Sequence, residues 1–531
     1  MFWADEIAAA ATGPQVVNDS KTPSGTVHVG SLRGPVTHDV IWRALRRHEV
    51  PARFLYGVDD MDPMDAQALL TPDAVDRYMG VPLSRVPAPP GSAAASYARH
   101  FVGELFLGTF GALGIQPEIY WMSERYAAGD LDPYVRTALD RADRIRDIYR
   151  RVSRVQKEGD WLPLSAICES CGRIGTTHVS GWDGSTVAYA CRPDLVDWAR
   201  GCGNSGRVSP FGGNAKLPFN VEWAARWSLF GVTIEGCGKD LATAGGSRDR
   251  SDAIAREVLE REPPRNVMYE FLNIGGRRMS TSGGVGAAAH ELADVVPPEQ
   301  LRLLFVRPRP QQAIEFDPDG TDAIPRLLDE SDRLAAATAG RPVRGDLPAD
   351  PERIFAAALP DPDADVVAEA AAHRPAFGHL ALLVQLPGVE LLERAAAEKG
   401  VPLTDRERAI LDERAAAARA WLATYAPERA RIAVQRDALP AAVVGLDSAQ
   451  RRFLATLAGA LAGAATAWTG EGLQAATFAA ARETGLAQGA AFAALYLAFL
   501  GQPSGPRAGW LLASLEPDFV VARLRAAGDA G

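Results

Sequence analysis

Cysteine, net basic charge and long apolar segments are scarce in this 531-residue chain. It has five cysteines, and 56 basic against 66 acidic residues give a formal net charge of -10. So few cysteines exclude a disulfide-stapled fold, and the acidic balance argues against a protein that coats nucleic acid by charge alone. The segment Met1 to Glu6 carries acids where a signal peptide needs a basic start. We therefore expect a cytoplasmic protein.

Two uncharged stretches, Phe453 to Gly470 and Gly485 to Pro506, are long enough to raise the question of a membrane span. The first is mainly alanine, glycine and threonine, and the second ends in glycines and prolines. Because this composition suits a bilayer poorly, we interpret both as buried helices of a bundle and expect no membrane partner.

The order of apolar runs indicates an α/β protein followed by a helical region. Strand-like runs occur around Val16 and at Arg53 to Val58, and a helical pattern starts at Ser31. Alternating strands and helices predict a parallel sheet covered by helices. The second run ends in the acidic residues Asp59, Asp60 and Asp62, where ligands bind in such sheets. From about Pro297 the composition changes to alanine, leucine and arginine, which favours helices.

The segment before the helix at Ser31 combines small residues with a histidine. Small residues let the backbone approach a phosphate closely, while an imidazole and a helix N-terminus face its negative charge. We therefore predict an ATP site formed by Pro23, Ser24, Gly25, Thr26, Val27, His28, Val29, Gly30 and Ser31. Taken alone, a His-x-Gly pattern also fits a plain turn with a surface histidine.

Four of the five cysteines lie within 35 residues of one another. Cys168 and Cys171 are separated by two residues, a spacing whose thiolates can share a tetrahedral zinc ion, and Cys191 with Cys202 can complete the set. Such a site is structural, because four protein ligands leave no open position. The alternative is a small apolar cluster with free thiols. His178 is a possible replacement ligand.

Beyond these single motifs, the chain resembles the class I lysyl-tRNA synthetases in segments that follow the family's order. They are Thr22–Arg33, Val58–Pro63, Cys168–Gly172, Gly201–Gly206, Lys216–Trp227, Gly231–Asp240, Gly245–Ser247, Arg278–Ser282 and Gly501–Gly509. The resemblance spans nearly the whole length. It implies a Rossmann-like (HUP-type) α/β catalytic domain with a zinc-ribbon-like insertion and a C-terminal all-α helical bundle. The expected limits are 1–155 and 213–296 for the catalytic domain, 156–212 for the insertion and 297–531 for the anticodon-binding-like bundle.

This resemblance also implies the reaction: ATP with Mg²⁺ activates lysine to an adenylate, and the lysyl group passes to tRNA(Lys). The segment around His28 and Gly30 matches the first nucleotide-binding signature. The second is a mobile loop at Arg278, Met279, Ser280, Thr281 and Ser282. The amino-acid pocket is expected at Gly25, Thr26, Asp59 and Asp240. We expect a monomer.

Three positions depart from the family's pattern. The family shows a glutamate after Arg33, a histidine after Asp240 and a lysine near the end of the second signature, where this chain has Gly34, Leu241 and Gly283. Because a buried ammonium needs an acidic partner, these departures leave three hypotheses open. The chain is an active lysyl-tRNA synthetase, a diverged paralogue that binds tRNA or supplies aminoacyl groups to another pathway, or a zinc-stabilised RNA-binding protein without catalysis.

In the helical region, the family binds the anticodon end of tRNA. Trp421 and Arg431 lie among mixed arginines and acids at helical spacing, which fits base stacking and phosphate contacts. The alternative for Trp421 is a core aromatic residue. The arginines of Asp140 to Arg154 can likewise form a basic track or a solvated helix face.

Overall fold

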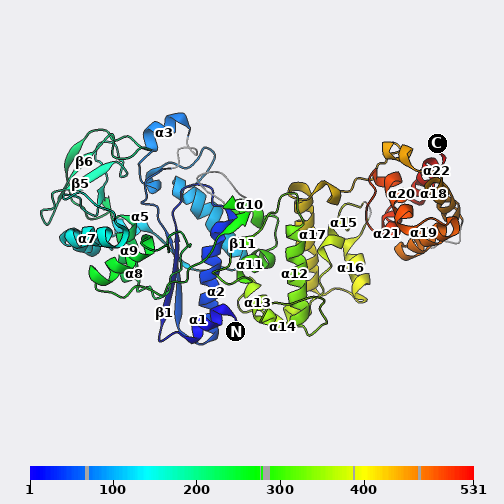
Figure 1. Cartoon of the computed structure of the whole chain (residues 1–531), viewed down its shortest axis with the longest axis horizontal. Coiled ribbons are helices and arrows are strands. Elements are labelled where there is room, and N and C mark those ends of the chain that lie inside the picture. Colours follow the sequence, from blue (N-terminus) through cyan, green and yellow to red (C-terminus); the bar gives the residue numbers. More distant parts are fainter. Residues whose placement is uncertain (66–70, 276, 279–287, 387–388, 464–467, 531) are drawn as a thin grey trace. The chain divides into compact units, whose positions relative to one another are not determined.

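The computed structural model describes residues 1–65, 71–275, 277–278, 288–386, 389–463 and 468–530, with only the backbone at 277–278. It divides into two compact units (Figure 1). Unit 1 comprises Met1–Asp317 with Arg333–Ala370, and unit 2 comprises Pro318–Asp332 with Ala371–Gly531. The domain limits expected from the sequence remain predictions.

A parallel sheet forms the centre of unit 1. Its strands β1 (Gln15–Lys21), β2 (Ala52–Val58) and β3 (Glu118–Trp121) pair in the order β1-β2-β3. On the other side of β1, Val17 pairs in parallel with Ile234, which pairs in parallel with Arg265. The two apolar runs of the sequence are therefore confirmed as neighbouring parallel strands. Their carboxyl ends are level, because Lys21 faces Val58 and Val58 faces Trp121.

Helix α2 (Arg33–Arg47) connects β1 to β2 and lies alongside these strands (Figure 1). A short 3-10 helix, η1 (Val29–Leu32), precedes it. The buried Arg33 donates to the carbonyl oxygens of Phe305, Arg309, Pro310 and Gln312, so the start of α2 is held against the segment that follows α11 (Pro298–Val306).

The other helices of unit 1 surround this sheet and its insertion. They are α1 (Trp3–Ala9), α3 (Pro72–Tyr78), the 3-10 helix η3 (Leu83–Arg85), the π-helix η4 (Arg99–Phe106), α4 (Leu107–Ala112), α5 (Met122–Ala127), α6 (Asp132–Asp140), α7 (Ala142–Ser153), α8 (Phe219–Phe230), α9 (Ser247–Glu257), α10 (Ala289–Ala293), α13 (Pro351–Ala358) and α14 (Val366–Ala371). Helix α12 (Ala323–Thr338) contributes residues to both units.

Tertiary contacts determine the helices of two segments in unit 1. The segment from Asp132 to Ser153 forms two helices, α6 and α7, because the chain is broken at Arg141, whose ψ of 25° is not helical and whose guanidinium donates to the Val258 carbonyl. The segment 340–365, which is rich in proline and aspartate, contains α13. Its buried apolar residues pack against α11, and tertiary packing of this kind outweighs the proline- and aspartate-rich composition.

Between α7 and α8 the chain forms two small antiparallel sheets. Strands β5 (Thr177–Ser180), β6 (Val187–Cys191) and β7 (Ser205–Val208) form one, and β4 (Ser165–Ala166) with β8 (Ala215–Lys216) forms the other. Later in unit 1, β9 (Leu272–Ile274) lies between β10 (Arg277–Arg278) and β11 (Ile314–Glu315).

Unit 2 is helical in its described residues. Its helices are α15 (Phe377–Leu383), α16 (Leu391–Lys399), α17 (Asp405–Thr424), α18 (Ser448–Leu461), α19 (Gly470–Thr484), α20 (Gln488–Leu500), α21 (Ala508–Ala513) and α22 (Pro517–Asp529), with 3-10 turns η5 (Glu428–Ala430) and η6 (Ala441–Gly445). Thr404 and Asp447 begin α17 and α18 with reciprocal capping boxes. Helices α18 to α22 share one apolar core.

Among the described helices, none is by itself long and apolar enough to span a bilayer. Helices α19 and α20 meet that length and composition only as a pair, bent by 118°. Both contribute buried residues to the shared core, as expected for bundle helices.

Replacing Gly509 by alanine is expected to destabilise unit 2. A Cβ at Gly509 would lie 2.1 Å from the Gly470 carbonyl oxygen and 2.4 Å from the Gln474 backbone nitrogen, so α21 would have to move away from α19. We expect a loss of about 2–3 kcal/mol in urea unfolding followed by circular dichroism. Gly489→Ala is the matched control: open space surrounds this helical glycine, and the change should stabilise by up to about 1 kcal/mol. Equal stability of the two variants would contradict this packing.

Candidate active site

The predicted nucleotide segment forms the connection between β1 and α2. Gly25 has φ 138°, a backbone conformation that favours glycine. His28 precedes η1, and its backbone carbonyl accepts a hydrogen bond from the Ser31 backbone N–H at 2.9 Å. The segment therefore lies beyond the carboxyl end of a strand and before a helix, which is where ligands bind in open α/β sheets.

The residues that follow the second signature lie against this segment. Met279, Ser280, Thr281, Ser282 and Gly283 lie outside the described residues, as does the side chain of Arg278. Ala288, five residues after Gly283, pairs in antiparallel fashion with His28, and the Ala289 backbone N–H donates to the Val27 carbonyl at 2.9 Å. The chain leaving the loop is thus joined to the predicted nucleotide segment by backbone hydrogen bonding.

A cavity of about 490 Å³ opens at the carboxyl ends of β1 and β2. Its wall is mixed: several acidic side chains alternate with aromatic and aliphatic ones. The lining residues are Asp19, Ser20, Lys21, Thr22, Ser24, Asp59, Asp62, Pro63, Asp65, Phe219, Trp223, Glu235, Gly236, Cys237, Leu241 and Tyr269. Since Ser24 belongs to the nucleotide segment, the cavity is continuous with it.

Two acids at the end of β2 have buried partners. Asp59 forms an ion pair with Arg226 of α8, and both side chains are at most 4% exposed. Burial raises the pKa of Asp59 to about 7, against the opposing effect of Arg226. Asp60 accepts hydrogen bonds from the backbone and hydroxyl of Ser123, the former at 2.8 Å, while burial raises its pKa.

Lys216 forms the second buried charge cluster. Its ammonium lies 2.9 Å from a Glu222 oxygen and 3.1 Å from an Asp62 oxygen. The Tyr126 hydroxyl also donates to Glu222 at 2.7 Å. Burial opposes the charge of Lys216, yet the neighbouring carboxylates raise its pKa above the usual range. Glu222 is therefore already paired within the protein.

Glu235 and Asp19 are the acids on the inner wall. The indole N–H groups of Trp223 and Trp227 donate to the two Glu235 oxygens at 2.9 and 2.7 Å. Asp19, on β1, is 5% exposed, and burial followed by the charge of Glu235 raises its pKa to about 8. Such a wall provides negative charge in a largely desolvated space, which suits a cationic ligand.

The predicted amino-acid pocket is placed only in part. Asp59 lines the cavity, whereas Gly25, Thr26 and Asp240 do not, and Asp240 is exposed. Leu241, at the departure noted in the sequence, does line it. Sequence reasoning missed the inner acids and the tyrosine, namely Asp19, Glu235 and Tyr269. The sequence did contain one signal for Asp19: it is an acidic residue within the strand-like run around Val16.

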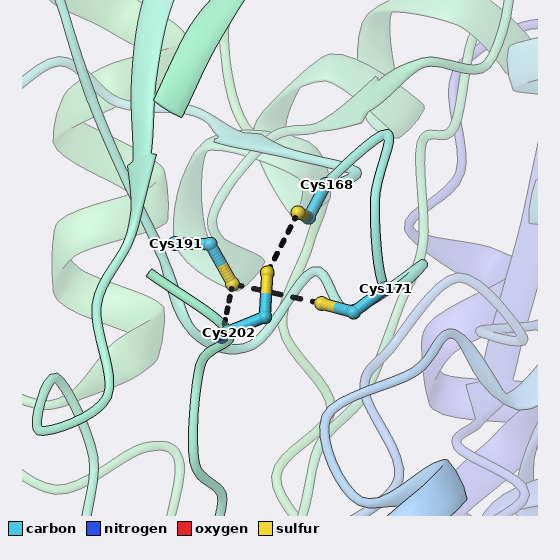
Figure 2. Close-up of side chains that lie close together, drawn as sticks. All are labelled: Cys168, Cys171, Cys191 and Cys202. Atoms are coloured by element: carbon cyan, nitrogen blue, oxygen red, sulfur yellow. Dashed lines mark hydrogen bonds between the residues drawn. The ribbon is translucent and has the colours of Figure 1, made fainter. Parts of the chain in front are cut away.

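Figure 2 shows the four clustered cysteines pointing toward one another. Cys168 and Cys202 have sulfur atoms 3.6 Å apart, and those of Cys171 and Cys191 are 3.7 Å apart. All four sulfurs lie within 4.8 Å of one another. Four thiolates around one tetrahedral ion with metal–sulfur bonds of about 2.3 Å would be about 3.8 Å apart. The cluster therefore has the dimensions of a metal site.

The backbone around these cysteines supports the clustering. Gly172 has φ 73° and donates its N–H to the Cys168 carbonyl at 2.8 Å, which closes the first turn. His178 belongs to a different group, with Glu158 and Asp160, so it is not a replacement ligand in this arrangement. Cys237 is 3% exposed, as expected for a buried small residue, and lies on the cavity wall instead.

In unit 2, Trp421 is 4% exposed and its ring packs edge-on against Phe377. This burial favours the core alternative for its side chain. Arg431 is exposed and donates to the Leu422 carbonyl at 3.0 Å. Its guanidinium is accessible on the surface.

Comparison with known families gives two matches. Residues 1–348 match the family model described as tRNA synthetases class I (K), and residues 418–528 match the anticodon binding domain. The first match covers the sheet, the cavity and the cysteine cluster. The second covers the part of unit 2 that contains α18 to α21 and most of α22.

Full-length relatives agree with these matches. A lysine–tRNA ligase of Methanosarcina barkeri is 33% identical over 549 residues, covering 100% of this chain and 98% of its own. One from Archaeoglobus fulgidus is 32% identical, covering 99% of this chain and 100% of its own. A crystal structure of a glutamate tRNA ligase from Elizabethkingia meningosepticum is 13% identical, covers 97% of this chain and 99% of that one, and has a TM-score of 0.44.

Lys216→Met should destabilise unit 1 by about 3–5 kcal/mol at neutral pH, because Glu222 would remain buried without its cation. The deficit should shrink as pH falls, since protonation removes the uncompensated charge. Chemical unfolding at several pH values measures it. The control Lys239→Met breaks an exposed pair with Glu270 and should cost less than about 1 kcal/mol. A deficit that does not change with pH would contradict the charge argument.

Proposed function

Because the chain belongs to the class I lysyl-tRNA synthetase family, we propose that it activates lysine with ATP and transfers the lysyl group to tRNA. The observation that carries this proposal is the acidic cavity with apolar walls beside the His28 segment. Such a cavity suits an ammonium on an aliphatic stem. A second family feature is the match of the C-terminal region to an anticodon binding domain.

In the activation step, a carboxylate oxygen of lysine attacks the α-phosphorus of ATP, and the bond to the bridging oxygen breaks to release pyrophosphate. A hydroxyl of the terminal tRNA adenosine then attacks the acyl carbon and releases AMP. Both steps build negative charge on oxygen, so positioned donors supply most of the rate. We assign this role to His28 and the backbone at Gly30, with the ATP-bound Mg²⁺ neutralising phosphate charge.

The second signature would act on the leaving pyrophosphate. We propose that Arg278 supplies the cation and that Ser280, Thr281 and Ser282 supply hydroxyl donors. Met279 completes this segment. No lysine stands at Gly283, and Lys239 forms an ion pair with Glu270 at 2.6 Å.

We further propose that Cys168, Cys171, Cys191 and Cys202 hold a structural Zn²⁺. The sulfur separations support a tetrahedral ion, and thiolates are the ligands that zinc prefers in closed sites. Bound there, the ion would cross-link the turn after β4, the end of β6 and the segment between β6 and β7.

For tRNA, we propose that the region matching the anticodon binding domain contacts the anticodon end and that the exposed Arg431 contributes to phosphate binding. The monomeric state and the cytoplasmic location stay predictions from the sequence. The same holds for the domain limits 1–155, 156–212, 213–296 and 297–531.

The proposed activity is tested by lysine-dependent exchange of pyrophosphate into ATP, assayed with each amino acid in turn. His28→Ala should reduce the exchange rate about 100-fold, because a donor to the phosphates is lost, and should leave tRNA binding within about twofold. The exposed His48 is the control, and His48→Ala should behave like the wild type. Exchange with another amino acid alone would contradict lysine as the substrate, and an unchanged rate in His28→Ala would contradict the nucleotide site.

The zinc proposal is tested by metal analysis of the purified protein, with about one zinc expected per chain. Cys171→Ser should lose most of the metal and lower the melting temperature, since metal binding contributes folding free energy. Cys237→Ser should keep the metal, because this cysteine is outside the cluster. Zinc-free protein whose stability does not respond to a chelator would contradict the site.

A further inference from the structure

Most acids on the cavity wall already have partners. Asp59 pairs with Arg226, Asp62 with Lys216, and Glu235 accepts from two indoles. Asp19 differs from them, because among the described residues no indole donates to it and no lysine or arginine side chain forms an ion pair with it. In the part of the chain that the structure describes, no lysine or arginine nitrogen lies within 4.0 Å of its carboxylate, although it is almost completely buried. The ionised form of a buried carboxyl group is costly without a cation in contact, so a cationic ligand that reaches Asp19 would stabilise that form.

The one ion-pair-range contact of Asp19 is with His38, 3.7 Å away. Both ring nitrogens of His38 are already engaged. Nδ1 lies 2.8 Å from the Gly34 carbonyl oxygen, and Nε2 lies 2.8 Å from the Gly236 backbone nitrogen. A backbone N–H can only donate, so Nε2 is the acceptor and Nδ1 carries the proton. Burial also lowers the pKa of His38, so the ring is neutral and does not offset the charge of Asp19.

Gly34 makes the position of the Asp19 carboxylate possible. A Cβ on Gly34 would lie 2.6 Å from Asp19 Oδ2 and 3.1 Å from the Tyr269 hydroxyl oxygen. Any side chain at position 34 would therefore compete for the space that the carboxylate occupies. This is the position at which the sequence departs from the glutamate of the related enzymes.

We propose that Asp19 binds the side-chain ammonium of the lysine substrate. This inference rests on the proposed function and adds a specificity-determining residue to it. The aliphatic stem of the substrate would lie against the apolar walls formed by Trp223, Phe219 and Leu241. The α-carboxylate must face the nucleotide segment, whose Ser24 also lines the cavity and is more exposed than Asp19. The buried Asp19 is thus left to bind the ammonium at the side-chain end of the lysine substrate.

The ionisation of Asp19 is consistent with this role. Burial and Glu235 raise its pKa to about 8, and the effects of Lys21 and Arg226 lower it. Tyr269 and the neutral His38 are the other titratable groups against it. An arriving ammonium favours the ionised form. Binding near neutral pH should therefore release a proton, and the KM for lysine should fall as pH rises toward about 8.5.

The first test is Asp19→Asn in lysine-dependent pyrophosphate exchange. We expect the KM for lysine to rise about 100-fold or more, with the KM for ATP changed less than about twofold. The pH dependence of the KM for lysine should flatten. Because asparagine removes a buried charge, the variant should be at least as thermally stable as the wild type at about pH 8.5. The exposed Asp73→Asn is the control for a general charge effect.

The second test exchanges the two positions. Gly34→Glu alone should lose lysine activation, because its carbons would collide with the Asp19 carboxylate and two acids would share one space. Asp19→Ala alone should lose it for lack of a carboxylate. Combining Asp19→Ala with Gly34→Glu should restore activation to within about tenfold of wild type. This recovery is the coupling expected of two side chains that compete for one place.

The outcomes separate the inference from the function on which it rests. Wild-type protein that shows no lysine-dependent exchange refutes the proposed function. Active wild type with an unchanged KM for lysine in Asp19→Asn overturns the assignment of Asp19 and leaves the function standing. If the double variant folds but is as inactive as Asp19→Ala, this also contradicts the claim that the side chains at positions 19 and 34 occupy the same space. A selective KM effect with recovery in the double variant supports the assignment.

Discussion

The buried ion pair between Asp59 and Arg226 is the interaction on which the cavity depends. It joins the carboxyl end of β2 to α8, and both side chains are at most 4% exposed. Neither charge would be tolerated there alone. Arg226 pairs with Asp59, and Lys216 pairs with both Glu222 and Asp62, so these three acids are held structurally, whereas Asp19 has no such ion pair among the described residues.

Parallel-sheet geometry explains why these groups converge. The strands end level, so residues just past β1 and β2 meet at one edge, and the segments at Ile234 and Tyr269 extend that edge through parallel bridges. Helix α2 starts at the same edge and brings Gly34 against β1. A ligand at this edge contacts several segments that are distant in sequence, which is the usual advantage of such sheets for binding.

Much of this arrangement could be predicted from local sequence. The strands β1 and β2, the turn at Gly25 and the CxxC turn at Cys168 each depend on neighbouring residues, and each lies where it was expected. The inner wall could not be predicted. Asp19 and Glu235 acquire their surroundings from tertiary contacts, and no local pattern tells a paired acid from an unpaired one. The same holds for Trp421. Core and surface aromatic residues occur in the same helical pattern, so only its burial in the structure distinguishes the two roles.

The change at Gly34 illustrates a general limit of motif reading. A binding site requires a carboxylate at a point in space, and any backbone position that reaches that point can supply it. Here Gly34 leaves space on α2 for the Asp19 carboxylate of the facing strand, because a glycine has no side chain to exclude it. A missing motif residue therefore indicates lost function only after the volume that it vacated has been shown to contain no equivalent group.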